Sequence, residues 1–272
     1  MEEKDLIKKL ESARLPQFRM EAAKEEVKKA LFAAAPKKQV SAYLKLVTAM
    51  AGMFALALVT YYVIDNMDEG NKFNRNGGVW STYCDAQEGG NSEIWPPAGS
   101  ASANDFEMSR PGYGETGYAV KITGKSGQKL GLNYNYLGLV NRFSANSSCP
   151  TCQGTNIRKY SGIMFKVKGH ITSGNLFFIL PHESNECVMD RLTCRSLTGY
   201  ADFEKEITAD VGDKWSTVAI DFRKDLTQPY WTTDAAKTDI NKVLENVHLF
   251  KWQYKNGNGE QVELWIDEVQ LY

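Results

Sequence analysis

Four of the five cysteines form two pairs whose spacing is suited to chemistry at sulfur. Cys149 and Cys152 lie in the motif CPTC, and Cys187 and Cys194 enclose a six-residue loop, while Cys84 stands apart. Such pairs act as zinc ligands, as a redox-active C-x-x-C pair, or as structural disulfides. The second pair is not C-x-x-C, and no thioredoxin-like alternation of strand and helix surrounds the first. We therefore expect two disulfides, with zinc binding and redox chemistry as the alternatives.

The sequence contains no recognisable catalytic constellation. The histidines, His170, His182 and His248, lack the H-x-x-H and H-E-x-x-H spacings of metal ligands, and neither a G-x-S-x-G motif nor a glycine-rich phosphate loop is present. Carboxylates are plentiful, but no pattern selects two of them as the acid and base of a glycosidase. We therefore expect a protein that is not an enzyme.

Aromatic side chains are the other group with chemistry to offer. All six Trp follow residue 64, together with ten Tyr and nine Phe. An aromatic ring presents a flat apolar face to the C–H face of a sugar, and a polar edge to its hydroxyls. Several rings fall in loops or on what we interpret as the polar phase of a strand, the alternative being that they pack between sheets. These are Tyr134 and Tyr136 in NYNY, Trp231 in QPYW, and Trp252 and Tyr254 in FKWQY.

Short strands must position these side chains, because helical periodicity almost vanishes after residue 64. Ile163, Phe165 and Val167 alternate with other residue types, two of them lysines, which is typical of a strand with one buried and one wet face. Many such strands, separated by turn residues and not by helices, predict a β-sandwich or barrel. One short helix is expected at TDINKVLENV. The 208 residues of segment 65–272 are enough for a single sandwich.

Residues 46–64, LVTAMAGMFALALVTYYVI, carry no charge. An uncharged apolar stretch of 18 or more residues is long enough to span a bilayer as a helix. Tyr61 and Tyr62 lie at one end, where interfacial aromatic residues are found in membrane helices. Because 45 residues precede the stretch, a cleaved signal peptide fits poorly. The segment is therefore predicted to be an uncleaved, single-pass signal anchor.

The charge distribution predicts the orientation of this anchor. Residues 1–45, a predicted helical tail, hold eleven Lys and Arg against seven Asp and Glu, whereas residues 65–272 hold 21 against 26. The positive-inside rule then places the N-terminus in the cytoplasm and the C-terminal domain in the periplasm or outside the cell, with the protein in the inner, cytoplasmic membrane. The overall net charge of −1 gives no reason to expect nucleic-acid binding.

Five pieces of the sequence match a known pattern in their order and spacing: IDNMDEG, NGGVW, YSGIMFKVKG, WSTVAIDFRKDLTQPYW and WIDEVQLY. On these motifs the segment from Val63 to Tyr272 resembles bacterial carbohydrate-binding modules of the galactose-binding-like jelly-roll type, most nearly family 11. The same fold is similar to that of complex I intermediate-associated chaperones, which are assembly proteins.

The resemblance implies a mainly β fold, a jelly-roll β-sandwich, with a ligand cleft across its concave sheet. It also implies that aromatic side chains act as stacking platforms and that an arginine donates to sugar hydroxyls. The ligand-binding residues implied for this chain are Trp80, Tyr134, Tyr136, Arg223, Trp231 and Trp252.

Many relatives hold a structural calcium ion, and the last predicted strand has a feature that fits one. Its hydrophobic residues share one phase up to Ile266 and the other from Val269, so the phase slips at Asp267–Glu268, which is the signal of a β-bulge. A bulge frees backbone carbonyls and re-aims a carboxylate. With Asp68 alongside, hard oxygen ligands for Ca²⁺ would converge. We expect Asp68 and Asp267 to be metal ligands, the alternative being two solvated acids.

These features predict a single-pass membrane protein whose exported jelly-roll binds a polysaccharide or oligosaccharide without catalysing a reaction. The alternative is a structural or assembly subunit of a cell-envelope membrane complex, whose jelly-roll binds another envelope protein. The absence of a linker after residue 64 favours this alternative, because a module held against the bilayer reaches distant polysaccharide poorly.

Overall fold

The structure is a computed structural model that describes residues 61–99, 106–128, 135–145, 153–182 and 201–272. These residues belong to one compact unit, Thr60–Tyr272. The predicted cytoplasmic tail over 1–45 and the predicted pairs Cys149–Cys152 and Cys187–Cys194 lie outside the described residues.

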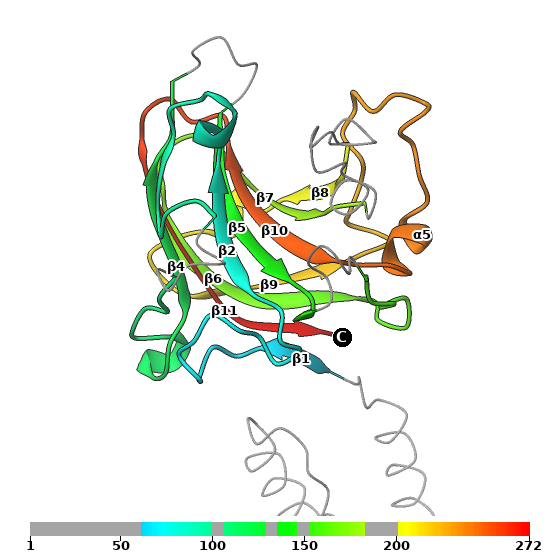
Figure 1. The fold of residues 1–272 in the computed structure, drawn as a ribbon, viewed down its shortest axis with the longest axis horizontal. Coiled ribbons are helices and arrows are strands. Elements are labelled where there is room, and N and C mark those ends of the chain that lie inside the picture. Colours follow the sequence, from blue (N-terminus) through cyan, green and yellow to red (C-terminus); the bar gives the residue numbers. More distant parts are fainter. Residues whose placement is uncertain (1–60, 100–105, 129–134, 146–152, 183–200) are drawn as a thin grey trace, which may run out of the picture. The chain divides into compact units, whose positions relative to one another are not determined.

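The unit is a sandwich of two antiparallel sheets, as the strand pattern predicted (Figure 1). The first sheet has six strands, with the long strand β11 at its centre and β1 paired along part of the same strand. In sheet order its strands are β3 (Glu93–Trp95), β4 (Val120–Lys125), β11 (Gln261–Leu271), β6 (Gly162–Ile171) and β9 (Ser216–Asp221), with β1 (Tyr62–Asp65) beside β11.

The second sheet has five strands and curls so that the face turned away from the first sheet is its concave side (Figure 1). Its strands, in order, are β2 (Trp80–Cys84), β5 (Tyr136–Arg142), β10 (Leu249–Lys255), β7 (Asn175–Leu180) and β8 (Phe203–Glu206). The short helices are η1 (Asp85–Glu88), η2 (Tyr113–Glu115), η4 (Thr208–Asp210) and α5 (Ile240–Leu244), the last within the predicted TDINKVLENV.

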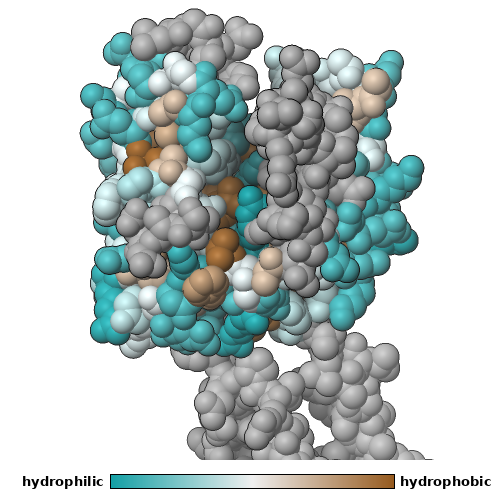
Figure 2. Space-filling view, in the orientation of Figure 1, coloured by the Kyte–Doolittle hydropathy of each residue, from teal (hydrophilic) through white to brown (hydrophobic). Residues whose placement is uncertain are grey.

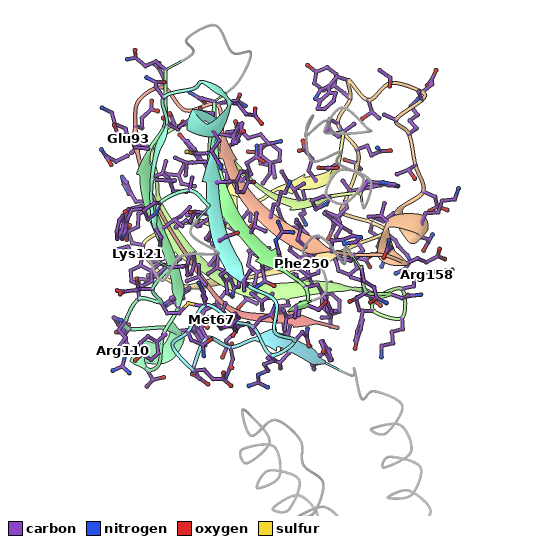
Figure 3. The ribbon with its side chains drawn as sticks, viewed as in Figure 1. Met67, Glu93, Arg110, Lys121, Arg158 and Phe250 are labelled. Carbon is purple, nitrogen blue, oxygen red and sulfur yellow. The ribbon has the colours of Figure 1, made fainter. Side chains whose placement is uncertain are left out.

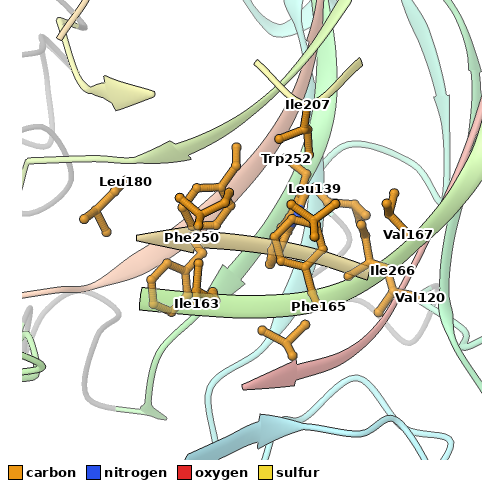
Figure 4. Packing of buried hydrophobic residues seen from close by; sticks show 14 of the residues in the cluster. Val120, Leu139, Ile163, Phe165, Val167, Leu180, Ile207, Phe250, Trp252 and Ile266 are labelled. Carbon is orange, nitrogen blue, oxygen red and sulfur yellow. The ribbon is translucent and has the colours of Figure 1, made fainter. Parts of the chain in front are cut away.

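The core fills the space between the sheets, and alternation along each strand determines which side chains enter it. Ile163, Phe165 and Val167 of β6 are fully buried, as their spacing predicted. They meet the inner face of the other sheet, where the Phe165 ring lies 5.9 Å from Phe178 and 5.3 Å from Trp252 (Figure 4). A core of this kind removes large apolar areas from water and is the main source of stability in the fold.

The prediction of a membrane helix over 46–64 is wrong at its C-terminal end. β1 begins at Tyr62 and pairs with β11, and Ile64 is fully buried in the sandwich core. Val63 and Ile64 are β-branched, so they suit a strand as well as an apolar helix, and hydropathy does not separate the two. The part of the segment up to residue 60 lies outside the described residues. Within the described ranges no helix is long and apolar enough to cross a membrane.

Candidate functional site

The concave face of the five-stranded sheet holds a tyrosine ring in a fixed position. Tyr83 of β2, Gly138 of β5 and Gln253 of β10 lie opposite one another in the sheet register. The Tyr83 hydroxyl donates a 2.9 Å hydrogen bond to Gln253 Oε1, so the ring reaches across the intervening strand. A Cβ on Gly138 would lie 3.0 Å from carbons of this ring, so glycine makes room for it. The half-buried ring is therefore positioned before any ligand arrives.

A second ring adjoins the first at the start of β5. The Tyr136 ring lies 5.8 Å from that of Tyr83, inclined by 43°. The Tyr136 backbone N–H donates to Asp85 Oδ2 at 3.2 Å, and this fully buried carboxylate also accepts from the N–H and the hydroxyl of Ser92 at 2.8 Å each. These bonds fix the end of β5 from which Tyr136 projects. Tyr136, a residue predicted from the sequence, therefore lies on the concave face, although only 9 % of it is exposed.

Charged and amide groups surround the rings on the same face. Lys251 Nζ lies 5.7 Å from the centroid of the Tyr83 ring. Lys255 Nζ lies 4.3 Å from the centroid of Phe177 and 2.6 Å from Glu204 Oε2. We call this surface the five-strand face, and define it by Tyr83, Tyr136, Phe177, Lys251, Gln253 and Lys255.

Figure 2 shows hydrophobic residues along a hollow in the middle of this view, with hydrophilic residues on its flanks. The five-strand face itself combines flat rings with hydrogen-bonding groups. Such a surface offers stacking to an apolar face and directed bonds to hydroxyls.

Two of the predicted ligand-binding residues are core residues. Trp80 and Trp252 are both 0 % exposed, and their rings lie 5.4 Å apart between the sheets. Trp80 Nε1 donates a 2.7 Å hydrogen bond to Asp65 Oδ2, which is also buried. The interpretation of FKWQY placed Trp252 on the wrong phase. In β10 the aromatic residues share the inward phase, whereas the lysines and the glutamine share the outward one, because the core accepts rings more readily than charges.

Arg223 is exposed but is occupied by the loops around it. Its Nε donates to Asn241 Oδ1 at 3.0 Å, and its Nη1 and Nη2 donate to the carbonyls of Tyr160 and Arg158 at 3.1 and 2.9 Å. These bonds join the loop after β9 to the segment before β6 and to α5. The structure therefore does not bring Arg223 to the five-strand face.

Trp231 lies on a braced loop that leaves the edge of the five-stranded sheet, where Thr227 pairs with Glu204 of β8. Gln228 Nε2 donates to the carbonyls of Ala201 and Ala236 at 2.7 and 2.9 Å, which fastens the loop at both ends. Trp231 is 49 % exposed, so its ring is accessible as expected. Tyr134, the remaining predicted residue, lies outside the described residues.

Five residues of the five-strand face were missed by the sequence interpretation, namely Tyr83, Phe177, Lys251, Gln253 and Lys255. The motif WSTYC contains the signal for the first, since alternation puts Tyr83 on the phase opposite to Trp80. Nothing local in the sequence pairs Tyr83 with Gln253, which is 170 residues away.

The charge of Asp68 acts on Asp267, so the two predicted metal ligands are near each other; Figure 3 labels Met67, the sequence neighbour of Asp68. The register of β11 shifts between Asp267 and Gln270, which confirms the predicted bulge. Asp267 is 2 % exposed and accepts hydrogen bonds from the backbone N–H groups of Tyr113 and Glu268, each at 2.7 Å.

Burial is the main cause that raises the pKa of Asp267 from 3.8 to about 7, and the nearby charges of Glu268 and Asp68 raise it further. Met67 and Glu268 are the sequence neighbours of the two predicted ligands, Asp68 and Asp267. Their φ values are 54° and 48°, a conformation that non-glycine residues seldom adopt. Strained backbone of this kind collects where a ligand or a function requires it. Within the described ranges no cluster of three or more His, Cys, Asp or Glu suited to a metal is present.

Cys84 is a free, buried thiol on β2. Its sulfur lies 3.6 Å from the Ser92 carbonyl oxygen, and burial raises its pKa. A thiol with a raised pKa holds little of the reactive thiolate at neutral pH, so Cys84 serves as a packing residue.

No protein-family model matches the chain, and no curated protein does. Solved structures similar to it include the family 11 carbohydrate-binding module of the cellulosomal cellulase Lic26A-Cel5E of Clostridium thermocellum, at 17% sequence identity and a TM-score of 0.44, covering 79% of this chain and 95% of the module. The solution structure of CtCBM11 is similar at 15% identity and a TM-score of 0.45, over 79% and 96% of the two chains.

The family 30 module of the Clostridium thermocellum cellulase Cel9D-Cel44B is similar at 12% identity, with a TM-score of 0.29. It covers 53% of this chain, which covers 76% of that module. The resemblance to family 11 that the sequence motifs indicated is thus also found among solved structures.

Proposed function

We propose that the five-strand face binds a neutral β-linked oligosaccharide or polysaccharide, and that the protein does so without catalysis. The observation that carries the proposal is the Tyr83 ring, held over Gly138 by its bond to Gln253 and flanked by Tyr136. A ring that is already fixed loses little conformational freedom on binding, so more of its stacking energy appears as affinity. Each sugar hydroxyl adds only about 1 kcal/mol net.

The first test is a glycan array followed by calorimetry with a β-1,3-1,4-mixed-linked tetrasaccharide. We expect weak binding, with a Kd of roughly micromolar to millimolar. Only the interaction energy that exceeds the entropy lost in ordering the sugar and the side chains appears as affinity. Tyr83→Ala should raise the Kd about tenfold or more, which corresponds to about 1.4 kcal/mol. Tyr83→Phe, which keeps the ring but loses the bond to Gln253, should have a smaller effect.

The matched control is Lys214→Ala, an exposed residue in the loop before β9, which should leave the Kd unchanged. If no neutral glycan binds while the domain is folded, the proposal is wrong, and an assembly subunit that binds an envelope protein through the same surface becomes the better interpretation.

We further propose that the chain is anchored in the inner membrane by a helix that ends before β1, with the sandwich on the periplasmic or extracellular side. Because β1 takes residues from Tyr62 onward, the helix must begin earlier than residue 46 to reach bilayer length. The sequence SAYLK before it allows this, since Lys45 can extend its ammonium to the headgroups. The exposed rings of Tyr61 and Tyr62, at the start of the described sandwich, suit an interface with lipid.

The anchor predicts two results. The full chain should remain with membranes through alkaline carbonate extraction, and a reporter fused after Tyr272 should be active only outside the cytoplasm. Ala51→Arg, near the centre of the proposed helix, should release a large share of the protein, because a central arginine costs about 2.5–3.5 kcal/mol in insertion. Wild-type protein that is extracted by carbonate would contradict the anchor.

We also propose one structural Ca²⁺ between Asp267 and Asp68. The two side-chain charges that act on the Asp267 carboxylate, those of Glu268 and Asp68, are both negative, so a cation would be favourable there. Carboxylate and carbonyl oxygens are the ligands that Ca²⁺ prefers. Calcium would join the start of the sandwich to its last strand, and would have no part in ligand binding.

A further inference from the structure

The outer face of the six-stranded sheet contains a pocket of about 280 Å³, on the side of the sandwich opposite to the five-strand face. Two neighbouring strands supply its floor: Trp95 of β3 lies directly opposite Thr123 of β4 in the register, and Lys121 lies two residues further along the same phase. Figure 3 places Lys121 on β4 and Glu93 further along the same edge of the sandwich. The residues that line the pocket include Trp95, Glu107, Met108, Ser109, Lys121 and Thr123.

The third segment that lines the pocket, residues 107–109, is held in place by backbone pairing. Ser109 and Ala119 exchange two hydrogen bonds, of 2.8 and 2.9 Å, just before β4 begins. Phe106 and Met108 are 4 % and 8 % exposed, so they fasten the segment to the core, while Glu107 between them is exposed. The pocket is therefore built by three segments that are all part of the packed fold.

Trp95 is a large apolar ring in the pocket that the core does not use. It is 62 % exposed, whereas Trp80, Trp252 and Trp265 are at most 8 % exposed. An exposed indole at the edge of a polar hollow is costly in water and gains when a flat apolar face covers it.

The ammonium of Lys121 is also fixed in advance. Its Nζ lies 2.9 Å from Glu263 Oε2 and 4.5 Å from the centroid of the Trp265 ring. That ring is held in turn, because Trp265 Nε1 donates to Glu263 Oε1 at 2.8 Å and Lys168 Nζ lies 4.6 Å from the ring centroid on the neighbouring strand. A donor held in this way can bond a ligand with little further loss of side-chain entropy.

The charges select the class of ligand. The Lys121 cation is already balanced by Glu263, and Glu107 adds a carboxylate, so an anionic ligand would be repelled. A purely apolar ligand would take water from the Glu107 carboxylate and from the hydroxyls of Ser109 and Thr123 without replacing its hydrogen bonds, at a cost of roughly 1–3 kcal/mol for each group. A neutral pyranose satisfies all of them, because it has an apolar face for the indole and hydroxyls for the polar groups.

We propose that this pocket is a second saccharide site, with Trp95 as its stacking platform and Lys121 and Glu107 as its hydrogen-bonding groups. The proposal rests on the proposed function and extends it. Since the two sites are on opposite outer faces of the sandwich, one chain can hold two strands of a polysaccharide, or bind one array with greater avidity than either site alone.

The test is calorimetry of the full chain in lipid nanodiscs with the β-1,3-1,4-mixed-linked tetrasaccharide. Wild-type protein should bind two molecules per chain, and Trp95→Ala should bind one with the remaining Kd unchanged. Tyr83→Ala should weaken the other site about tenfold or more, and Trp95→Phe should retain two sites with the second weakened. Circular dichroism checks that each variant is folded. Replacing Trp95 should not change the fold, because its side chain is exposed.

The outcomes separate the two proposals. If binding is to a single site that Tyr83→Ala removes and Trp95→Ala leaves alone, the second site is wrong and the proposed function stands. If Trp95→Ala removes the only site and Tyr83→Ala does not, the pocket binds sugar and the five-strand face does not. If folded protein binds nothing, both are overturned.

Discussion

Replacing Trp252 with alanine should lower the free energy of unfolding of the sandwich by about 3–5 kcal/mol. The ring is fully buried and contacts rings from both sheets: Trp80 at 5.4 Å, Phe165 at 5.3 Å and Phe178 at 5.6 Å between centroids. Its removal loses the transfer free energy of an indole and leaves a cavity that the two sheets cannot fill without moving. Because a domain is stable by only about 5–15 kcal/mol, this is a large share of the total.

Urea denaturation followed by circular dichroism measures the effect. The matched control is Trp231→Ala, which removes the same side chain from an exposed loop and should change stability by no more than about 0.5 kcal/mol. If Trp252→Ala is as stable as wild type but loses sugar binding, then Trp252 faces solvent and the phase of β10 is the reverse of that described.

The same residue shows where sequence reasoning succeeds and where it fails. Period-two alternation predicted a sandwich or barrel, of which the structure is the first, and it correctly predicted the inward set Ile163, Phe165 and Val167, because lysines mark the outward phase of that strand. In β10 the lysines mark the phase equally well, but tryptophan is found both in cores and at binding surfaces. The expectation of a sugar platform therefore led to the wrong phase for Trp252, although its neighbours Lys251 and Gln253 indicated the right one.

The boundary at β1 could not be predicted from hydropathy. The apolar run continues through Val63 and Ile64, and burial in a sheet or in a bilayer selects the same residue types. Only the pairing of Tyr62 with Leu271, 209 residues later, decides between them. Pairings of this kind also create the five-strand face and the Trp95 pocket, which explains why neither was found from local patterns.

The bulge at Asp267–Glu268 is the opposite case, because a slip of phase within one strand is a local signal and the structure contains it. What the sequence does not reveal is the environment of the carboxylate. Burial of Asp267 depends on the loop that contains Tyr113, whose backbone N–H it accepts, and that loop is distant in the sequence.

Adding calcium to EDTA-treated protein should raise its melting temperature, and Asp267→Asn should abolish the rise. A cation that binds only the folded state stabilises it by about 2.7 kcal/mol at a hundred times its Kd. For a domain of this size each kcal/mol shifts Tm by about 2–4 °C, so a rise of roughly 5–11 °C is expected. Asp213→Asn, which changes an exposed aspartate before β9, is the control and should keep the full rise.

The way in which the melting temperature changes with pH distinguishes calcium binding at Asp267 from general screening by salt. Since the pKa of Asp267 is raised from 3.8 to about 7 in the folded protein, ionising this carboxylate costs more in the folded than in the unfolded state. In EDTA the contribution of Asp267 to the stability of the folded state is therefore fully present below about pH 4 and is lost as the pH rises through 7. Wild type should then melt at a higher temperature at pH 5 than at pH 8, and Asp267→Asn should reduce this difference.

With calcium the dependence on pH should reverse. The ion binds the ionised carboxylate and competes with the proton, so the rise in Tm should be small at pH 5 and largest at pH 8. Magnesium at the same ionic strength should produce less, because it requires a smaller, octahedral site. A melting temperature that calcium leaves unchanged at pH 8 in folded wild type, or raises equally in Asp267→Asn, would show that the two carboxylates do not hold a metal. Burial, with the nearby charges of Glu268 and Asp68, would then account for the raised pKa of Asp267.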